Sequence, residues 1–189
     1  MLDNALIAIL ATQLEAASST AGWGYLVAQK NQPSQEGVPT APTIFFEKLF
    51  DHEYGYPMRT DTYQPTPDNY AHVETQVVET TFQISALVPQ DPTDLTIPTA
   101  SDVVGYMKLF IQNSITLAAF VSSQVSMLRV SEIRNPYAID DKDRFEASPS
   151  FDLVLQHNRT ITLSVPAAVK VVGQPSPAPG DNNAGTFPV

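Results

Sequence analysis

The sequence predicts an α+β fold built from a mostly antiparallel sheet that is flanked by helices. Apolar residues recur at helical spacing near the start of the chain and again after residue 100. Between and after these segments, apolar and polar residues alternate, as they do in strands with one buried face. The segments follow the order helix, strands, helices, strands. This grouping is typical of an antiparallel sheet rather than of repeated strand–helix–strand units.

The start of the chain is predicted to be helical. An apolar stripe that runs from Leu6 to Ala17 indicates a helix over residues 3–21, and Gly22 marks its end. A polar stretch with three prolines follows over residues 31–42 and predicts an irregular loop. Strands are expected on either side of this loop, over residues 24–29 and 43–50.

Residues 51–69 are expected to form a long Pro/Tyr-rich loop that leaves the body of the fold. The segment contains three prolines, three tyrosines and one glycine, and loops of this length usually have a partner or a function. Aromatic rings offer a large contact area and freeze few rotors on binding. We therefore predict contacts to neighbouring subunits or partners from Tyr54, Tyr56, Arg59 and Tyr63. A groove for a sugar or another ligand, lined also by Tyr70, is the alternative.

The middle of the chain predicts one long strand and two helices. Alternating residues indicate a strand from Val73 to Val88, which Pro89 ends. Ser101 is the expected N-cap of the next helix, with Asp102 in its first turn. The buried stripe of this helix is expected to consist of Val103, Met107, Phe110, Ile111 and Ser114. A second helix is expected over residues 115–122.

The last part of the domain predicts strands around an acidic loop. Strands are expected over residues 127–133, 151–166 and 168–172. The loop over residues 134–148 resembles a calcium loop only loosely, because it lacks the central glycine and the twelve-residue frame. A solvated or partner-facing loop is the favoured interpretation, and its candidate contact residues are Asp140, Asp141 and Asp143.

The chain is predicted to consist of a single domain over residues 1–172 and a Pro/Gly-rich extension over residues 173–189. The extension carries too few apolar groups to offset the entropy of ordering. We expect it to be a flexible arm that orders on neighbouring subunits. Its candidate contact residues are Pro175, Pro177, Pro179 and Phe187.

Charge excludes direct recognition of nucleic acid. The chain has 20 acidic and 10 basic residues, a net charge of −10. Residues 36–94 hold ten acids and two basic residues, a net charge of −8, and such a segment repels phosphate. No apolar run approaches the roughly 18 residues of a membrane helix. A basic leader is also missing, since Asp3 lies where its positive charge is expected, so we expect a soluble intracellular chain without membrane partners.

The sequence predicts no catalytic, cofactor or metal site. The chain has no cysteine, and it contains no phosphate loop, nucleophile elbow or HExxH spacing. His72 and Glu74 share one strand face and could supply two metal ligands, but an ordinary solvated face is the preferred interpretation. A carboxylate-dependent hydrolase is the remaining enzymatic alternative, and no pair of acids is favoured for it.

Several local strings resemble those of a known family. Residues 78–87 read VETTFQISAL, residues 125–135 read VSMLRVSEIRN, and later segments contain Arg144-Phe145-Glu146 and SFDLVL over residues 150–155. Together with the order of elements, these strings resemble the neck and tail-terminator-like proteins of contractile-tailed bacteriophages, some of which are called gateway proteins. The resemblance covers residues 3–172.

This resemblance implies a structural virion protein rather than an enzyme. It implies a homo-oligomeric ring, sixfold in symmetry, that joins the portal–adaptor complex to the tail tube or sheath. An acidic ring suits this role, because like charges keep passing DNA from sticking. We expect such a protein to be made in the host cytoplasm and to reside at the head–tail junction of the virion. The alternatives are a tail terminator that caps the tube or sheath and, from another class, a monomeric module that binds glycans or a host surface.

Overall fold

The computed structural model describes residues 1–30, 41–65, 68–89, 93–139 and 145–166. It confirms an α+β fold with a mostly antiparallel sheet. In chain order the elements are α1 (Asp3–Thr20), β1 (Leu26–Gln29), β2 (Thr43–Glu53), β3 (Met58–Pro65), β4 (Asp68–Leu87), α2 (Ala100–Ile111), α3 (Ser114–Ser122), β5 (Val125–Val130), β6 (Tyr137–Ile139), β7 (Phe145–Ala147) and β8 (Ser150–Pro166).

The chain divides into two compact units. The first unit contains Met1–Arg59 and Glu74–Ile161, and the second contains Thr60–Val73 and Thr162–Val189. Strands β3, β4 and β8 contribute residues to both. The predicted division into a domain over residues 1–172 and an extension over residues 173–189 stays a prediction, because residues 167–189 lie outside the described residues.

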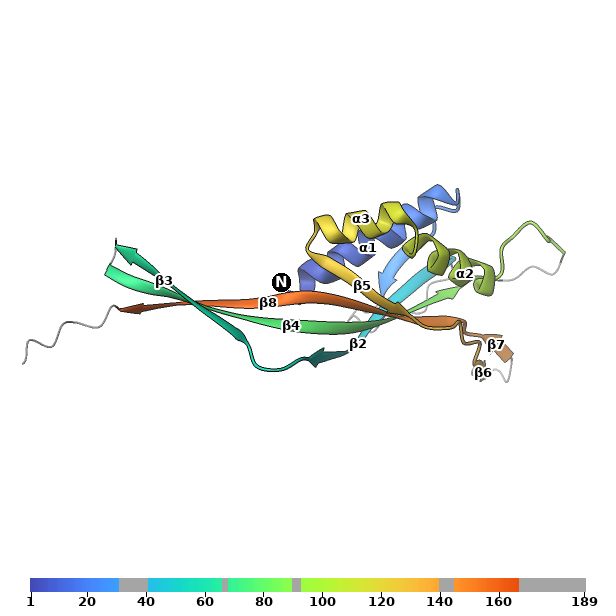
Figure 1. The fold of residues 1–189 in the computed structure, drawn as a ribbon. Coiled ribbons are helices and arrows are strands. Elements are labelled where there is room, and N and C mark those ends of the chain that lie inside the picture. The colour runs from blue at the N-terminus through green and yellow to red at the C-terminus, as the bar shows by residue number, and fades with distance from the viewer. Residues whose placement is uncertain (31–40, 66–67, 90–92, 140–144, 167–189) are drawn as a thin grey trace, which may run out of the picture. The chain divides into compact units, whose positions relative to one another are not determined.

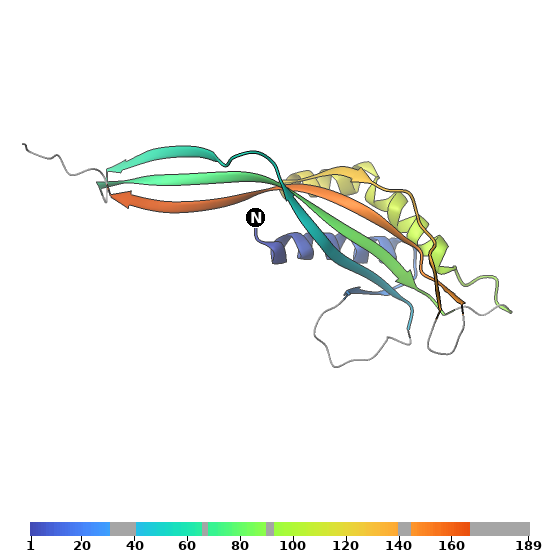
Figure 2. The ribbon, with the colours of Figure 1, turned by 90° about the horizontal axis from the view of Figure 1, so that it is seen from below.

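The first unit has helices on one face of its sheet. The strand order is β1-β2-β4-β8-β5, with β1 parallel to β2 and with β2 antiparallel to β4. Figures 1 and 2 show α1, α2 and α3 on the same side of these strands, and within the described residues no helix lies on the opposite side. The core lies between these layers and includes Leu10, Phe82, Ile84, Val103, Met107, Phe120, Phe151 and Leu155.

Local signals explain where the helices begin and end. Gly22 follows α1 with a φ of +74°, a conformation that favours glycine. The N-cap of α2 is Thr99, not the predicted Ser101, because the Thr99 hydroxyl and the Asp102 carboxylate form a reciprocal capping box. Asn113 caps α3 by accepting a hydrogen bond from the Thr116 amide at 2.8 Å.

The predicted buried stripe of α2 is wrong at two positions, Phe110 and Ser114. Ser114 is exposed and begins α3. Val103, Met107 and Ile111 are fully buried, as expected. Phe110 is only partly buried and packs against the edge of the core, where its ring lies 6.2 Å from that of Tyr106. The helix therefore turns Val104, rather than Phe110, toward the sheet.

The expected long loop over residues 51–69 is largely strand. β2 continues to Glu53, β3 begins at Met58, and β4 begins at Asp68. The turn after β2 places Gly55 at a φ of +63°. Pro65 ends β3, a position where the missing amide hydrogen is tolerated. Pro57 and Pro65 therefore lie at the two ends of β3, and the residues between them adopt extended structure.

Candidate assembly surfaces

A polar cluster lies in the first unit where α1 begins. Its members come from α1, β2, β4 and β8, and we define the α1 cluster as Asp3, Lys48, Asp51, Glu53, Thr80, His157 and Arg159. The Lys48 ammonium donates to Asp3 at 2.7 Å and to Asp51 at 2.8 Å. Its contacts therefore tie the first turn of α1 to the neighbouring strand β2.

Two further side chains extend the α1 cluster across the sheet. The Thr80 hydroxyl donates to Asp51 Oδ1 at 2.7 Å, so its oxygen accepts from the buried His157 Nε2 at 3.2 Å. The Arg159 guanidinium donates to Asp51 at 3.1 Å and to Glu53 at 2.9 Å. These bonds join β2, β4 and β8.

The cluster shifts the pKa of three of its members. Partial burial opposes ionisation of Asp51, but hydrogen bonds from Lys48, Thr80 and Arg159 outweigh it and lower its pKa. Burial likewise opposes the charge of Lys48, yet its contacts to Asp3 and Asp51 raise its pKa overall. Burial lowers the pKa of His157, and so keeps this ring neutral.

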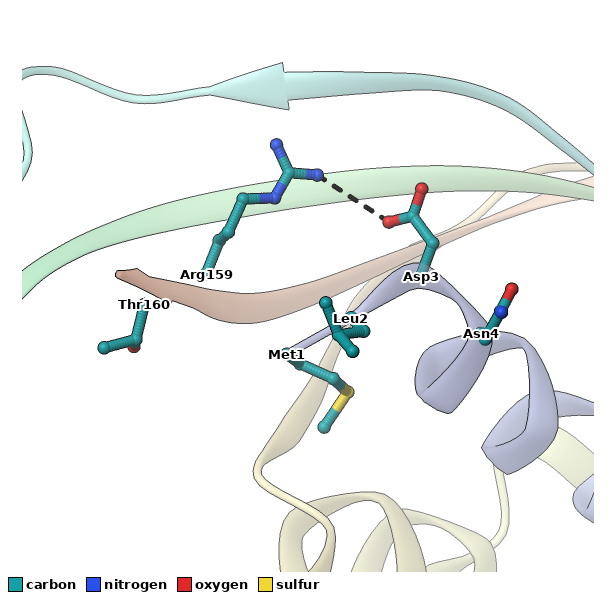
Figure 3. A pocket seen from close by; sticks show the side chains of 6 residues that line it. All are labelled: Met1, Leu2, Asp3, Asn4, Arg159 and Thr160. Atoms are coloured by element: carbon teal, nitrogen blue, oxygen red, sulfur yellow. Dashed lines mark ion pairs between the residues drawn. The ribbon is translucent and has the colours of Figure 1, made fainter. Parts of the chain in front are cut away.

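A surface pocket opens beside the α1 cluster (Figure 3). Its lining residues are Met1, Leu2, Asp3, Asn4, Arg159 and Thr160. Figure 3 shows Arg159 pointing toward Asp3, and their charged atoms lie 3.7 Å apart. The two charged side chains of this lining pair with each other, so the contact ties the start of α1 to β8. Among the described residues, no three His, Cys, Asp or Glu side chains lie together as metal ligands would.

Large apolar side chains are exposed on α2 and α3. The sequence from Leu109 to Leu128 contains no Asp, Glu, Lys or Arg. Three large side chains of these helices are mostly exposed: Leu109 at 69%, Ile115 at 81% and Val121 at 66%. We call Leu109, Ile115 and Val121 the helical apolar surface. Exposed apolar side chains on a stretch without charged residues make these helices a candidate contact surface.

The length and apolar composition of the helices were compared with those of a membrane-spanning helix. No single described helix has both the length and the apolar composition to cross a membrane, whereas α2 and α3 meet those criteria only as a pair that is bent by 61°.

The second unit contains a sheet with two different faces. Asp61 contacts His72 at 2.6 Å, and the Tyr63 and Tyr70 rings lie 5.3 Å apart, so these side chains share one face. A pocket on this face is lined by Asp61, Tyr70, His72 and Val165. The other face contains Asn69, which donates to Ser164. By strand alternation, the second face also contains Thr60, Thr62, Gln64, Ala71, Val73 and Thr162. The described residues of this face are therefore uncharged.

Comparison with known proteins identifies the family. A family model described as E217 gateway protein gp29 matches residues 5–167. The chain belongs to this gateway family. It is therefore a structural protein of the phage neck and a component of the virion. No individual curated protein matches the chain.

The structure places the predicted contact residues of this gateway-family protein in different parts of the chain. Tyr54 and Tyr56 belong to the first unit, with Tyr56 99% exposed and the Tyr54 hydroxyl donating to Glu79 at 3.0 Å. Arg59 pairs with Glu74 at 3.0 Å. Tyr63 and Tyr70 come together in the second unit, where Tyr63 donates to Asp68 at 2.9 Å.

The other predicted residues lie outside the described part of the chain. They are Asp140, Asp141 and Asp143, which fall between β6 and β7, and Pro175, Pro177, Pro179 and Phe187. The two residues that were considered as metal ligands have partners within the chain. His72 contacts Asp61, and Glu74 pairs with Arg59.

Sequence reasoning missed the α1 cluster. Thr80 and His157 are separated by 77 positions, and no local motif joins them. The alternation of side chains along the strands did contain a signal. Thr80 lies two residues before the buried Phe82, and His157 lies two residues after the buried Leu155, so both polar residues share the buried face. Polar residues at inward positions indicate buried hydrogen bonds.

Proposed function

We propose that this gateway-family protein forms a homo-oligomeric ring in the phage neck, joins the head to the tail and lets the genome pass through its centre. The observation that carries the proposal is the family match over residues 5–167. That match favours the gateway role over the tail-terminator alternative. The ring is a hexamer that contacts the portal–adaptor complex on one side and the tail tube or sheath on the other. The protein is made in the host cytoplasm.

The charge of the protein supports passage of DNA without specific binding. The net charge is −10, and the excess of acids is concentrated in residues 36–94. A ring of such subunits repels phosphates, so DNA slides through it without being held.

The helical apolar surface supports self-association. Leu109, Ile115 and Val121 are mostly exposed in the single chain, and an apolar surface of this kind gains free energy when a neighbouring subunit covers it. Tyr54, Tyr56, Arg59 and Tyr63 supply further contacts to neighbouring subunits or partners. Further contacts come from the loop residues Asp140, Asp141 and Asp143 and from the arm over residues 173–189.

The solution mass of the purified protein tests the proposal. We expect light scattering over a concentration series to report a closed oligomer, and negative-stain images of the same fractions to show rings with a central hole. A protein that stays monomeric at every concentration, even when mixed with the portal–adaptor and tail-tube proteins, would contradict the proposal.

A further inference from the structure

The sheet of the second unit has two edges on which no described strand pairs. Among the described strands, β3 pairs with β4 alone, and Figure 2 shows β4 between β3 and β8. β5 accompanies β8 only as far as the pair Val125↔His157. Residues 162–166 of β8 therefore have a described partner on one side only. Unpaired edges of this kind offer rows of amide and carbonyl groups to another strand.

Neither edge carries the devices that usually prevent pairing. Monomeric proteins protect edge strands with lysines, prolines or bulges. Residues 60–64 of β3 and 162–165 of β8 contain no Lys, Arg or Pro, and prolines occur only at the strand ends, Pro65 and Pro166. The charged residue in these segments, Asp61, is already paired with His72.

The sheet also lacks cover within the described residues of its unit. The side chain of every residue of β3 is exposed. Leu163 and Val165 of β8 remain 52% and 46% exposed. A narrow sheet without a packed face is marginally stable in water. Additional strands at its edges would stabilise it.

The two edges are unlike, and their directions fit a ring. Contacts between β3 and β4 join Asp61 to His72 and Tyr63 to Tyr70, so these strands are antiparallel. Asn69 contacts Ser164, and Thr80 contacts His157, so β4 and β8 are antiparallel as well. β3 and β8 therefore run in the same direction. Rotation about a ring axis preserves strand direction along that axis, so β8 of one copy meets β3 of the next in parallel.

We propose that residues 162–165 of β8 in one copy pair in parallel with residues 60–64 of β3 in the next copy. The partner is thus a second copy of this chain. Because unlike edges meet, the contact is head-to-tail, and in the closed ring of the proposed function it repeats between every pair of neighbouring copies. The second units then form a continuous closed sheet without free edges. This inference rests on the ring of the proposed function and adds the strands that close it.

Cysteine cross-linking tests the pairing, since the natural chain has no cysteine. Thr60→Cys or Thr62→Cys on β3 is combined with Thr162→Cys or Ser164→Cys on β8, four double variants in all. These residues share the uncharged face, so their thiols can meet across the proposed contact. After mild oxidation of the assembled full-length protein, we expect at least one double variant to give a ladder of covalent multimers that ends at the ring number. The matched single-cysteine variants should stay monomeric on denaturing gels.

Three results would overturn the inference, and they differ in what they say about the ring. Rings in negative stain without a ladder from any double variant would refute the β3–β8 pairing and leave the proposed function intact. Single-cysteine variants that cross-link to dimers as efficiently as the double variants form their ladder would also refute it, because like edges would then meet. A monomer without a ladder would contradict both the pairing and the ring.

Discussion

His157 shows how one buried polar residue links the strands to the start of α1. Its imidazole is 2% exposed and hydrogen-bonds to Thr80. Burial is the largest cause that lowers its pKa, and the positive charges of the Met1 amine and Arg159 act in the same direction. The Asn158 backbone and Asp51 oppose this shift without cancelling it. The folded protein therefore keeps the ring neutral.

This shift predicts acid sensitivity that begins near the ordinary pKa of histidine, 6.5. The unfolded chain binds a proton more readily than the folded protein, so the stabilisation is complete above that value and decreases as the pH falls below it. Asp51 acts in the same direction, but only below its ordinary value of 3.8. We expect His157→Gln to flatten the fall in the free energy of unfolding between about pH 7 and pH 5. Denaturant unfolding at several pH values measures the free energy of unfolding of both proteins. The same pH dependence in the unsubstituted protein and in His157→Gln would refute this prediction.

The burial of two phenylalanines predicts different costs of truncation. Phe120 is fully buried, whereas Phe110 is only partly buried at the edge of the core. Phe120→Ala is expected to lower the free energy of unfolding by about 3–5 kcal/mol, because it leaves a cavity. Phe110→Ala should cost about 1–2 kcal/mol, from lost contact area alone. Chemical denaturation compares them, and an equal or larger loss for Phe110→Ala would contradict the assigned packing.

At the scale of elements, the hydrophobic periodicity of the sequence predicted those helices and strands that bury one face. The α1 stripe and the alternation in β8 each follow one buried face, and both elements were predicted close to their observed bounds. The β3 strand was missed because its exposed residues alternate without an apolar face. Its stability depends on pairing with β4, and a local pattern does not report pairing with a strand elsewhere in the chain. The α1 cluster was missed for the same reason, since its residues meet only in the folded chain.

The capping box of α2 gives a prediction at this scale. Thr99→Ala removes the hydroxyl that accepts from the Asp102 amide at 3.2 Å, so it should lower the free energy of unfolding by about 0.5–2 kcal/mol. Ser101→Ala is the matched control, because Ser101 lies inside the helix and should change stability by less than about 0.5 kcal/mol. Thermal or denaturant unfolding of both variants measures the difference. A larger loss for Ser101→Ala than for Thr99→Ala would indicate that Ser101 is the N-cap, as the sequence predicted.

The helical apolar surface gives a second prediction at the scale of elements. Ile115→Asp places a charge on a side chain that is 81% exposed, so the single chain should fold normally. If neighbouring subunits cover this surface, the buried charge should raise the concentration needed for ring assembly at least about tenfold. Leu95→Asp is the control, because Leu95 is 94% exposed and lies outside this surface. Light scattering compares both variants, and unimpaired assembly of Ile115→Asp would exclude the surface from the subunit contact.

At the scale of the whole molecule, net charge determines how the ring treats DNA. The subunit charge of −10 predicts no saturable binding of duplex DNA, even at low salt, where any electrostatic attraction would be strongest. Fluorescence anisotropy of a labelled duplex, titrated with assembled rings, measures this, and a basic DNA-binding protein serves as the positive control. Tight binding that weakens with added salt would contradict an inert passage.

A cryo-electron microscopy reconstruction of the neck in intact virions tests the central claim most directly. The account predicts a ring layer between the portal–adaptor complex and the tail tube, into which the first unit fits in repeated copies around the DNA axis. A reconstruction whose neck layers are all formed by other chains, or in which this fold lies away from the axis, would contradict it.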